Sequence, residues 1–352
     1  CNCKSWNEVY ESISLILDVD YVGIPCFTRQ RFSVLKLAEL IKNVNPKVKL
    51  WLGGPHATFL DICILEKFEY IDYIIRGEGE ETAVCLINNN SILQQVDGIT
   101  FRNEHGKIIR NKDRKKIVQL EKFPVPLQSV EELENLNQSD SLLFHFPSFR
   151  GKKLKIAPLI SSRGCNGNCS FCCNRAYWGK QRYVHLEFLK SQLDYYYTKG
   201  IIFFDVYDDN FTENKQLIYE FTKYILDNKI DVHWWCSSRV DSVDVELLRK
   251  MKQAGCFMIS YGVESGSQLI LNNINKGVKI ENIVKAGELA KQVGLDFRVT
   301  ISIGHVGESI KTIQETIALL NCIKPKQVAL FILKVYPGTP VYEQMINKKI
   351  LS

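Results

Sequence analysis

The segment SSRGCNGNCSFCCNRAYWG, residues 161–179, decides how this chain folds and what chemistry it carries. Within it, Cys165, Cys169 and Cys172 have the spacing C-x3-C-x2-C. Three thiolates can bind three irons of a 4Fe–4S cluster, which leaves the fourth iron open to an external ligand. The loop also contains Gly164 and Gly167, which let a backbone wrap tightly around a bulky group. We therefore predict an iron–sulfur site on this loop.

A zinc site and a set of structural thiols are the alternatives for the same cysteines. Structural zinc takes four ligands, usually as two separated pairs. Here Cys173 is adjacent to Cys172, and no second pair of cysteines or histidines follows nearby. Buried structural thiols would not cluster on a glycine-rich polar loop. The iron–sulfur interpretation is therefore favoured, with Cys173 as a bystander.

Strands and helices alternate from this loop towards the C-terminus. Apolar runs predict six strands, at 155–162, 201–208, 233–239, 257–265, 297–304 and 328–335. Helical periodicity predicts helices near 185–198, 213–227, 243–254, 280–293 and 308–322. Six β/α units are too few for a closed barrel, so we predict an open, partial (β/α)6 barrel of the TIM type over residues 155–345. Its active site should lie at the C-terminal ends of the strands.

Residues 1–125 show a second alternation, ahead of a linker that we place at 126–154. The expected elements are strands at 20–27, 47–54 and 70–77, helices at 33–44, 59–67 and 80–88, and a hairpin at 98–111. This order is typical of a parallel α/β sheet with helices on both faces, a Rossmann-like or flavodoxin-like domain. Ligands bind such sheets at the carboxyl ends of the strands. The residues at those ends are Thr28, Gly53, Gly54, Gly77 and Gly79.

Composition narrows the class of protein further. The chain has 352 residues, 45% of them hydrophobic, and a net charge of +6 with basic and acidic residues intermixed. We therefore expect no nucleic-acid-binding face, and no apolar stretch is long enough to span a membrane. The 12 cysteines, most of them inside apolar runs, indicate a reduced cytoplasmic protein. Both ends look truncated, and residues 346–352 would begin a further region.

The cysteine loop resembles the signature of the radical S-adenosylmethionine (SAM) family, in which an aromatic residue precedes the third cysteine. Phe171 is that residue here. The resemblance implies the partial barrel already inferred and a cluster whose open iron chelates the amino and carboxylate groups of SAM. An electron from the cluster would then cleave SAM to methionine and a 5′-deoxyadenosyl radical.

The resemblance also assigns SAM-binding roles to residues at the strand ends. Asp208 and Asp209, followed by Asn210, match contacts to the amino group. The alternative for the two aspartates is an Asx-rich helix cap. For Arg239, which is expected at the SAM carboxylate, the alternative is a surface salt bridge. The other expected contacts are Arg239 for the carboxylate, Glu264 for the ribose, Gly304 for the adenine-side loop, and Val335 and Tyr336 beside adenine.

The N-terminal part is similar to the cobalamin (B12)-binding domain that one radical SAM subgroup carries. The matching segments are YVGIPCFT, LGGPHATF and RGEGEET, and they imply cobalamin contacts at Thr28, Gly53, Gly54, Gly77 and Gly79. The first strand of that domain, the loop after it and the second strand should precede Cys1, and in some proteins that loop supplies a histidine to cobalt. We therefore interpret His56 as a loop residue rather than a cobalt ligand.

The resemblance predicts a cobalamin-dependent methyltransferase that acts on an unactivated carbon or phosphorus centre, with an electron donor such as flavodoxin or ferredoxin. Methyl would pass from methylcobalamin to a substrate radical between the two domains. A radical SAM cyclase or oxidoreductase of a tetrapyrrole-like substrate is the first alternative. A non-catalytic iron–sulfur protein is the second, and a tRNA-modifying enzyme is a third within the family. The sequence names neither the small-molecule substrate nor a general acid or base.

Overall fold

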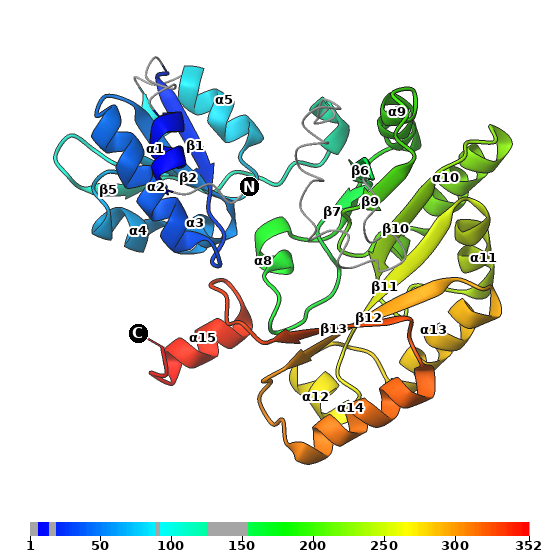
Figure 1. Cartoon of the computed structure of the whole chain (residues 1–352). Coiled ribbons are helices and arrows are strands. Elements are labelled where there is room, and N and C mark those ends of the chain that lie inside the picture. The colour runs from blue at the N-terminus through cyan, green and yellow to red at the C-terminus, as the bar shows by residue number, and fades with distance from the viewer. Residues whose placement is uncertain (1–5, 14–18, 89–91, 125–153, 352) are drawn as a thin grey trace. The chain divides into compact units, whose positions relative to one another are not determined.

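The structure is a computed structural model that describes residues 6–13, 19–88, 92–124 and 154–351 (Figure 1). The chain divides into two compact units. The first consists of residues 1–117, 171–179 and 335–352, and the second of residues 118–170 and 180–334. The predicted linker at 126–154 lies almost entirely outside the described residues.

The first unit is built on a five-stranded sheet in the order β1-β2-β3-β4-β5. The first three strands are parallel, and the last two form the expected antiparallel hairpin. The strands are β1 (Tyr21–Pro25), β2 (Lys49–Gly53), β3 (Tyr73–Ile75), β4 (Ile99–Arg102) and β5 (Ile108–Arg110). The helices are α1 (Trp6–Ile13), α2 (Arg31–Val44), α3 (Gly54–Phe59), α4 (Asp61–Lys67), α5 (Glu80–Asn88), α8 (Asn174–Trp178) and α15 (Pro340–Asn347).

Both faces of this sheet are buried, as predicted. Successive residues of a strand point to opposite faces, and in β3 Ile74 packs in one apolar cluster while Tyr73 and Ile75 pack in another. The first cluster includes Ala38 and Ile41 of α2, and the second includes a leucine of α5. Burial of each such aliphatic side chain contributes about 1.5–3 kcal/mol.

The second unit contains the predicted six-stranded parallel sheet, in the order β13-β12-β11-β10-β9-β6. The strands are β6 (Ile156–Leu159), β9 (Phe203–Val206), β10 (His233–Ser238), β11 (Cys256–Glu264), β12 (Asp296–Ile303) and β13 (Gln327–Ile332). The helices are α9 (Leu186–Tyr197), α10 (Lys215–Asp227), α11 (Val245–Gln253), α12 (Gln268–Asn273), α13 (Ile280–Gln292) and α14 (Ile310–Ile323). Strands β6 and β13 are the two edges, so the barrel is open as expected.

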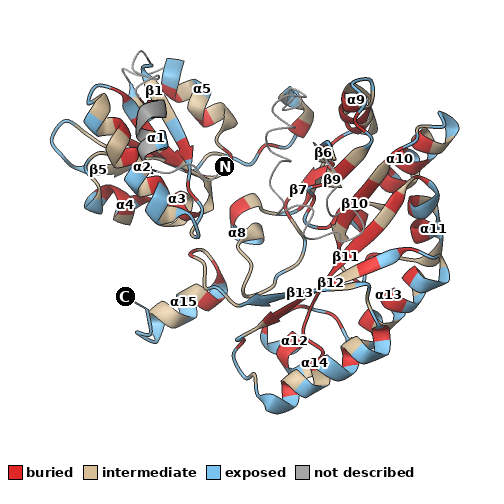
Figure 2. Cartoon of the chain, in the orientation of Figure 1, coloured by how far each residue is buried: buried red, intermediate tan, exposed pale blue. Residues whose placement is uncertain are grey.

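The helices of the second unit cover one face of its sheet, and buried residues concentrate along the strands (Figures 1 and 2). Aromatic side chains fill the layer between them: Phe204 of β9 contacts Tyr196 of α9, and Trp234 of β10 contacts Phe211. The sequence analysis missed the six-residue helix α12, because its length is too short for a clear helical period. Within the described residues, no helix is both long and apolar enough to cross a membrane.

Candidate active site

The cysteine loop follows a short ribbon in which β7 (Ser162–Arg163) pairs with β8 (Arg182–Tyr183) in the antiparallel sense. Gly164 has φ +90°, a left-handed conformation that favours glycine, and it turns the chain into the loop. The backbone N–H of Gly167 donates to Sγ of Cys165 at 3.3 Å, and the N–H of Asn174 donates to Sγ of Cys172 at 3.5 Å. Backbone N–H groups therefore already point at two of the predicted cluster ligands.

Gly167 lies close to two of the thiols on the loop. A Cβ atom at this position would lie 3.4 Å from Sγ of Cys165 and 3.9 Å from Sγ of Cys169. The three predicted ligands are half-buried cysteines on the loop. Among the described residues, no three His, Cys, Asp or Glu side chains are gathered closely enough to hold a metal ion. Thiols are the ligands that iron–sulfur clusters take, but the structure does not bring Cys165, Cys169 and Cys172 together into such a group, so their assignment as cluster ligands stays a prediction.

Asp208 anchors the strand that leads into the cysteine loop. Its carboxylate is 3% exposed and accepts a hydrogen bond of 2.8 Å from the N–H of Ser161. It also accepts from the hydroxyls of Ser161 and Ser162. Burial raises the pKa of Asp208, and these hydrogen bonds act in the opposite direction. The side chain is thus engaged with the chain itself, a role that the sequence analysis did not foresee beside the predicted SAM contact.

Asn210, on the turn after β9, organises a second polar network. Its Oδ1 accepts from the N–H of Arg239 at 3.0 Å and from the hydroxyl of Ser242 at 3.2 Å. Its Nδ2 donates to Glu213 at 2.6 Å. The hydroxyl of Thr212 lies 2.6 Å from that of Ser242. These bonds tie the ends of β9 and β10 together and place Arg239 at the strand end.

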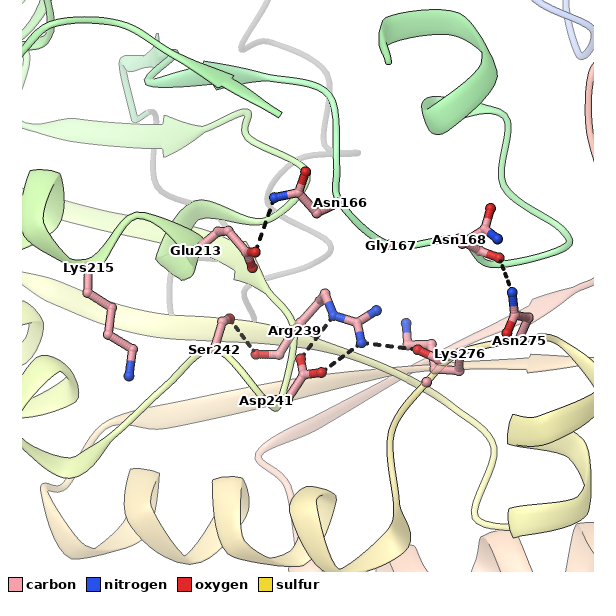
Figure 3. Close-up of a pocket in the computed structure, with 11 residues that line it drawn as sticks. Asn166, Gly167, Asn168, Glu213, Lys215, Arg239, Asp241, Ser242, Asn275 and Lys276 are labelled. Carbon is pink, nitrogen blue, oxygen red and sulfur yellow. Dashed lines mark hydrogen bonds and ion pairs between the residues drawn. The ribbon is translucent and has the colours of Figure 1, made fainter. Parts of the chain in front are cut away.

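Arg239 lies against the cysteine loop, beside a cavity of about 510 Å³ (Figure 3). Its guanidinium makes a bidentate pair with Asp241 at 2.9 and 2.8 Å and donates to the carbonyl oxygen of Lys276 at 3.0 Å. Its Nη1 is 3.2 Å from the position of a Cβ on Gly167. The ion pair that the sequence analysis gave as the alternative is therefore present, and the predicted contact with the SAM carboxylate stays a prediction.

Charges of both signs influence the first cysteine. Burial raises the pKa of Cys165, the Gly167 N–H lowers it, Asp209 raises it and Arg239 lowers it. Of the two predicted aspartates, Asp208 is buried and Asp209 is exposed. Asp209 is therefore the carboxylate that a cationic ligand near the loop could reach.

Glu264 ends β11 in an unusual conformation. Its φ is +68°, and the register of β11 against β12 shifts between Gly262 and Glu264. Such bulges and left-handed non-glycine residues cluster at functional sites, since they re-aim a side chain. The carboxylate is buried and its Oε1 lies 3.0 Å from Nζ of Lys276, a residue that the sequence analysis did not select. The predicted ribose ligand is thus held by a buried lysine.

The face of the six-stranded sheet opposite its helices carries a second pair of charges. Phe204 faces the helices, so its neighbour Asp205 faces the other way. The strand register places Arg298 of β12 on that same face, where its Nε donates to Ser260 at 3.0 Å. Burial raises the pKa of Asp205 to about 7, although Arg298 lowers it. The acid within the apolar run IIFFDVYD was a usable signal that the sequence analysis passed over.

The remaining predicted SAM residues fall in different places. Gly304 has φ +98°, and its N–H donates to Glu308 in the turn after β12. Phe171, Val335 and Tyr336 belong to the first compact unit. There Tyr336 lines a cavity together with Thr28 and Gly54, a set that the sequence analysis had divided between adenine and cobalamin.

Two cavities of the first unit lie at the carboxyl ends of its parallel strands. One of about 440 Å³ is lined by Gly53, Gly54, Gly77 and Gly79, with Trp51 and Tyr177. The other, of about 680 Å³, is lined by Thr28 and Gly54 with several aromatic and proline side chains. The structure therefore brings every residue predicted to contact cobalamin to one of these two cavities.

Gly23 lines the first of these cavities, and Arg76 directly precedes its lining residue Gly77. A Cβ on Gly23 would lie 2.3 Å from Nε1 of Trp51, so the indole occupies the space that a side chain would need. Arg76 is 4% exposed and donates to the carbonyl oxygen of Ile99 at 2.7 Å. It precedes Gly77, whose φ is +68° and whose N–H donates to Thr58 at 2.9 Å. Hydrogen bonds of Arg76 and Gly77 thus hold the start of the glycine loop.

The interpretation of His56 as a loop residue was wrong. His56 lies in helix α3 and is 8% exposed, because the chain turns directly from β2 into that helix at Gly54. Its Nδ1 is 3.1 Å from the hydroxyl of Thr28, and burial lowers its pKa. It is a packed, neutral residue that orients Thr28.

Two family models match this chain. The radical SAM superfamily model matches residues 159–320, and the B12 binding domain model matches residues 5–87. These ranges contain the cysteine loop and the glycine-lined strand ends, respectively. The chain therefore carries a radical SAM domain preceded by a B12-binding domain, as the sequence analysis predicted.

Curated relatives match most of this chain at low identity. An uncharacterised methyltransferase of Pyrococcus horikoshii is 28% identical over 95% of this chain and 71% of its own length. The anaerobic magnesium-protoporphyrin IX monomethyl ester cyclase of Rubrivivax gelatinosus is 25% identical over 99% of this chain. The cytidylyl-2-hydroxyethylphosphonate methyltransferase of Streptomyces wedmorensis is 26% identical over 84%. The chain spans 62% and 60% of the length of these last two.

Two solved structures share the fold over nearly the whole chain. The radical SAM methyltransferase TsrM of Kitasatospora setae, with cobalamin and a 4Fe–4S cluster bound, has a TM-score of 0.77 at 15% identity, over 98% of this chain and 67% of its own. The cobalamin-dependent radical SAM enzyme OxsB has a TM-score of 0.73 at 19% identity, over 99% of this chain and 49% of its own. At these identities the likeness confirms the fold.

Proposed function

We propose that this chain is the catalytic part of a cobalamin-dependent radical SAM methyltransferase that acts on an unactivated centre of a small molecule. One observation carries the proposal. The same chain combines a three-cysteine loop at the mouth of a partial barrel with two glycine-lined cavities at the strand ends of a B12-binding domain. A radical SAM protein that only cleaved SAM would need the first feature and not the second.

The cofactors would be a 4Fe–4S cluster held by Cys165, Cys169 and Cys172, SAM, and cobalamin. Together they supply an electron for the reductive cleavage of SAM and a methyl group for transfer. Arg239 interacts electrostatically with Cys165 and Cys169, and its positive charge would offset the negative charge of the ligated loop. Asp209 would accept hydrogen bonds from the ammonium group of SAM. Glu264, aimed by its left-handed backbone and held by Lys276, would accept from the ribose hydroxyls.

The substrate would lie on the face of the six-stranded sheet opposite its helices. That face carries Asp205, Ser260 and Arg298 together with a buried apolar cluster that includes Trp235 and Met258. Apolar surroundings with a few polar groups are typical of small-molecule sites. The electron donor would be a protein such as flavodoxin or ferredoxin. The 12 cysteines, most of them inside apolar runs, support a reducing, cytoplasmic location.

A radical SAM cyclase is the second candidate, because relatives with that function match almost the whole chain. The two functions differ in their products. A methyltransferase adds the mass of one methylene to its substrate, whereas ring closure by oxidation removes hydrogen. The curated relatives include both methyltransferases and a cyclase, so analysis of the reaction product distinguishes the two candidate functions.

The first test is anaerobic reconstitution of the full-length protein with iron, sulfide and hydroxocobalamin, followed by dithionite and SAM. Release of 5′-deoxyadenosine that is lost in Cys169→Ala, together with retained cobalamin, is the expected result. Failure of the cluster to form would contradict the radical SAM function. Deoxyadenosine without retained cobalamin would keep the radical chemistry and exclude methyl transfer through cobalamin.

A further inference from the structure

Helix α8 is packed within the first compact unit, although it follows the cysteine loop directly. It begins at Asn174, two residues after Cys172. Its Tyr177 is 6% exposed, and the tyrosine hydroxyl donates a hydrogen bond of 2.8 Å to the carbonyl oxygen of Gly77. A segment that contains a predicted cluster ligand is thus bonded to the glycine loop of the B12-binding sheet.

Two further side chains of the same unit hold Tyr177. The ring of Phe59, at the end of α3, meets the Tyr177 ring edge-on with a centroid separation of 6.3 Å. Nζ of Lys116 donates to the carbonyl oxygen of Tyr177 and lies 5.7 Å from the ring centroid. The lysine therefore places a positive charge at the C-terminal end of the helix, where the helix dipole favours it.

Tyr177 lines both cavities of the first unit. The smaller cavity contains Gly77, whose carbonyl oxygen accepts from Tyr177, and the larger contains Cys173, the neighbour of Cys172. A ligand that filled the two cavities would contact Tyr177 in each of them. Movement of the tyrosine would be transmitted to α8, because the helix has only five residues.

We infer that Tyr177 is a positioning residue that couples the corrinoid site to the cysteine loop: a corrinoid in the two cavities fixes Tyr177, and Tyr177 fixes α8 and Cys172. The inference rests on the proposed function and deepens it, since it assigns a link between the two cofactors. The residue acts through the helix and touches no reacting atom.

Hydrogen–deuterium exchange of the full-length, cluster-loaded protein tests this link under anaerobic conditions. The probe is cyanocobalamin at saturation, because its cyanide ligand resists replacement by protein thiols. In the wild type, cyanocobalamin should slow amide exchange in the peptide covering 171–179. In Tyr177→Phe the slowing should fall by about fivefold, as expected for loss of one hydrogen bond. Lys116→Met, which breaks a different bond to the same helix, should reduce it as well.

Tyr224→Phe is the matched control, because it removes a hydroxyl that donates to Asp194 at 2.8 Å in the second unit. It should keep the full slowing. Bound cyanocobalamin is measured by absorbance after gel filtration in every sample. A wild type that binds cyanocobalamin without slowed exchange at 171–179, or a Tyr177→Phe protein with wild-type slowing, would overturn the inference alone. A wild type that binds no cyanocobalamin would overturn the inference and the proposed cobalamin function together.

Discussion

Nζ of Lys276 lies 3.0 Å from Oε1 of Glu264, and the two side chains are only 7% and 12% exposed. The same lysine presents its backbone carbonyl oxygen to Arg239. A Cβ on Gly262 would lie 2.9 Å from Nζ of Lys276, so the pair also needs a glycine beside it. One residue of the loop after α12 therefore positions two of the predicted SAM-binding side chains.

Lys276→Met should lower the free energy of unfolding by about 3–5 kcal/mol, because it leaves a buried carboxylate without its partner. Urea denaturation followed by circular dichroism measures the change. Lys36→Met is the control, since its pair with Glu39 is exposed and contributes less than about 1 kcal/mol. Equal, small effects of the two substitutions would show that Glu264 does not depend on Lys276.

Asp208→Asn should reduce the amount of cluster that the protein can hold. The amide retains one acceptor oxygen for Ser161 and Ser162 where the carboxylate has two, so the strand before the cysteine loop loses part of its anchor. Iron and sulfide per chain after reconstitution should fall several-fold while the circular dichroism spectrum stays unchanged. Asp227→Asn, at the exposed end of α10, should bind a normal amount of cluster. Full cluster content in Asp208→Asn would exclude the anchoring role.

Asp205 should make folding stability depend on pH. Its pKa is raised to about 7 in the folded protein, above the ordinary value of 3.8 for an aspartate, so the folded state binds the proton more tightly than the unfolded chain. The stability from this group is fully present below about pH 4 and is lost as pH rises to about 7, by up to about 1.4 kcal/mol per unit. When the wild type and Asp205→Asn are denatured across this range, the wild type should lose more stability with rising pH than the variant, because only the wild type has the contribution of Asp205. Parallel curves would contradict the assignment.

Gly167→Ala should impair cluster binding with little effect on the apoprotein. The added methyl group would lie 3.2 Å from Nη1 of Arg239 and 3.4 Å from Sγ of Cys165, in the space beside the thiols. Gly287→Ala, in helix α13, adds the same group at ordinary contact distances of 3.4 Å and should leave the cluster intact. Absorbance of the reconstituted cluster compares the two. A normal cluster in Gly167→Ala would show that the space is not used.

Much of the fold was predictable because its signals are local. The six strands of the second unit, the three parallel strands of the first and the hairpin at 98–111 each follow from apolar periodicity or turn residues within a dozen positions. Short elements gave weaker signals, and α12 was missed for that reason. A predicted strand also predicts where its C-terminal end lies, so the glycines that line the cavities could be selected from the sequence.

The sequence by itself determined the cysteine spacing, the order of strands and helices, and the residue types at each strand end, because these are properties of neighbouring residues. Only the tertiary structure decided which side chains meet across long separations. It joined Asp208 to Ser161, Glu264 to Lys276 and Tyr177 to Gly77, and it buried His56 in a helix. The physical reason is that burial and partnership, which set the charge and orientation of a polar group, depend on the packing of distant segments.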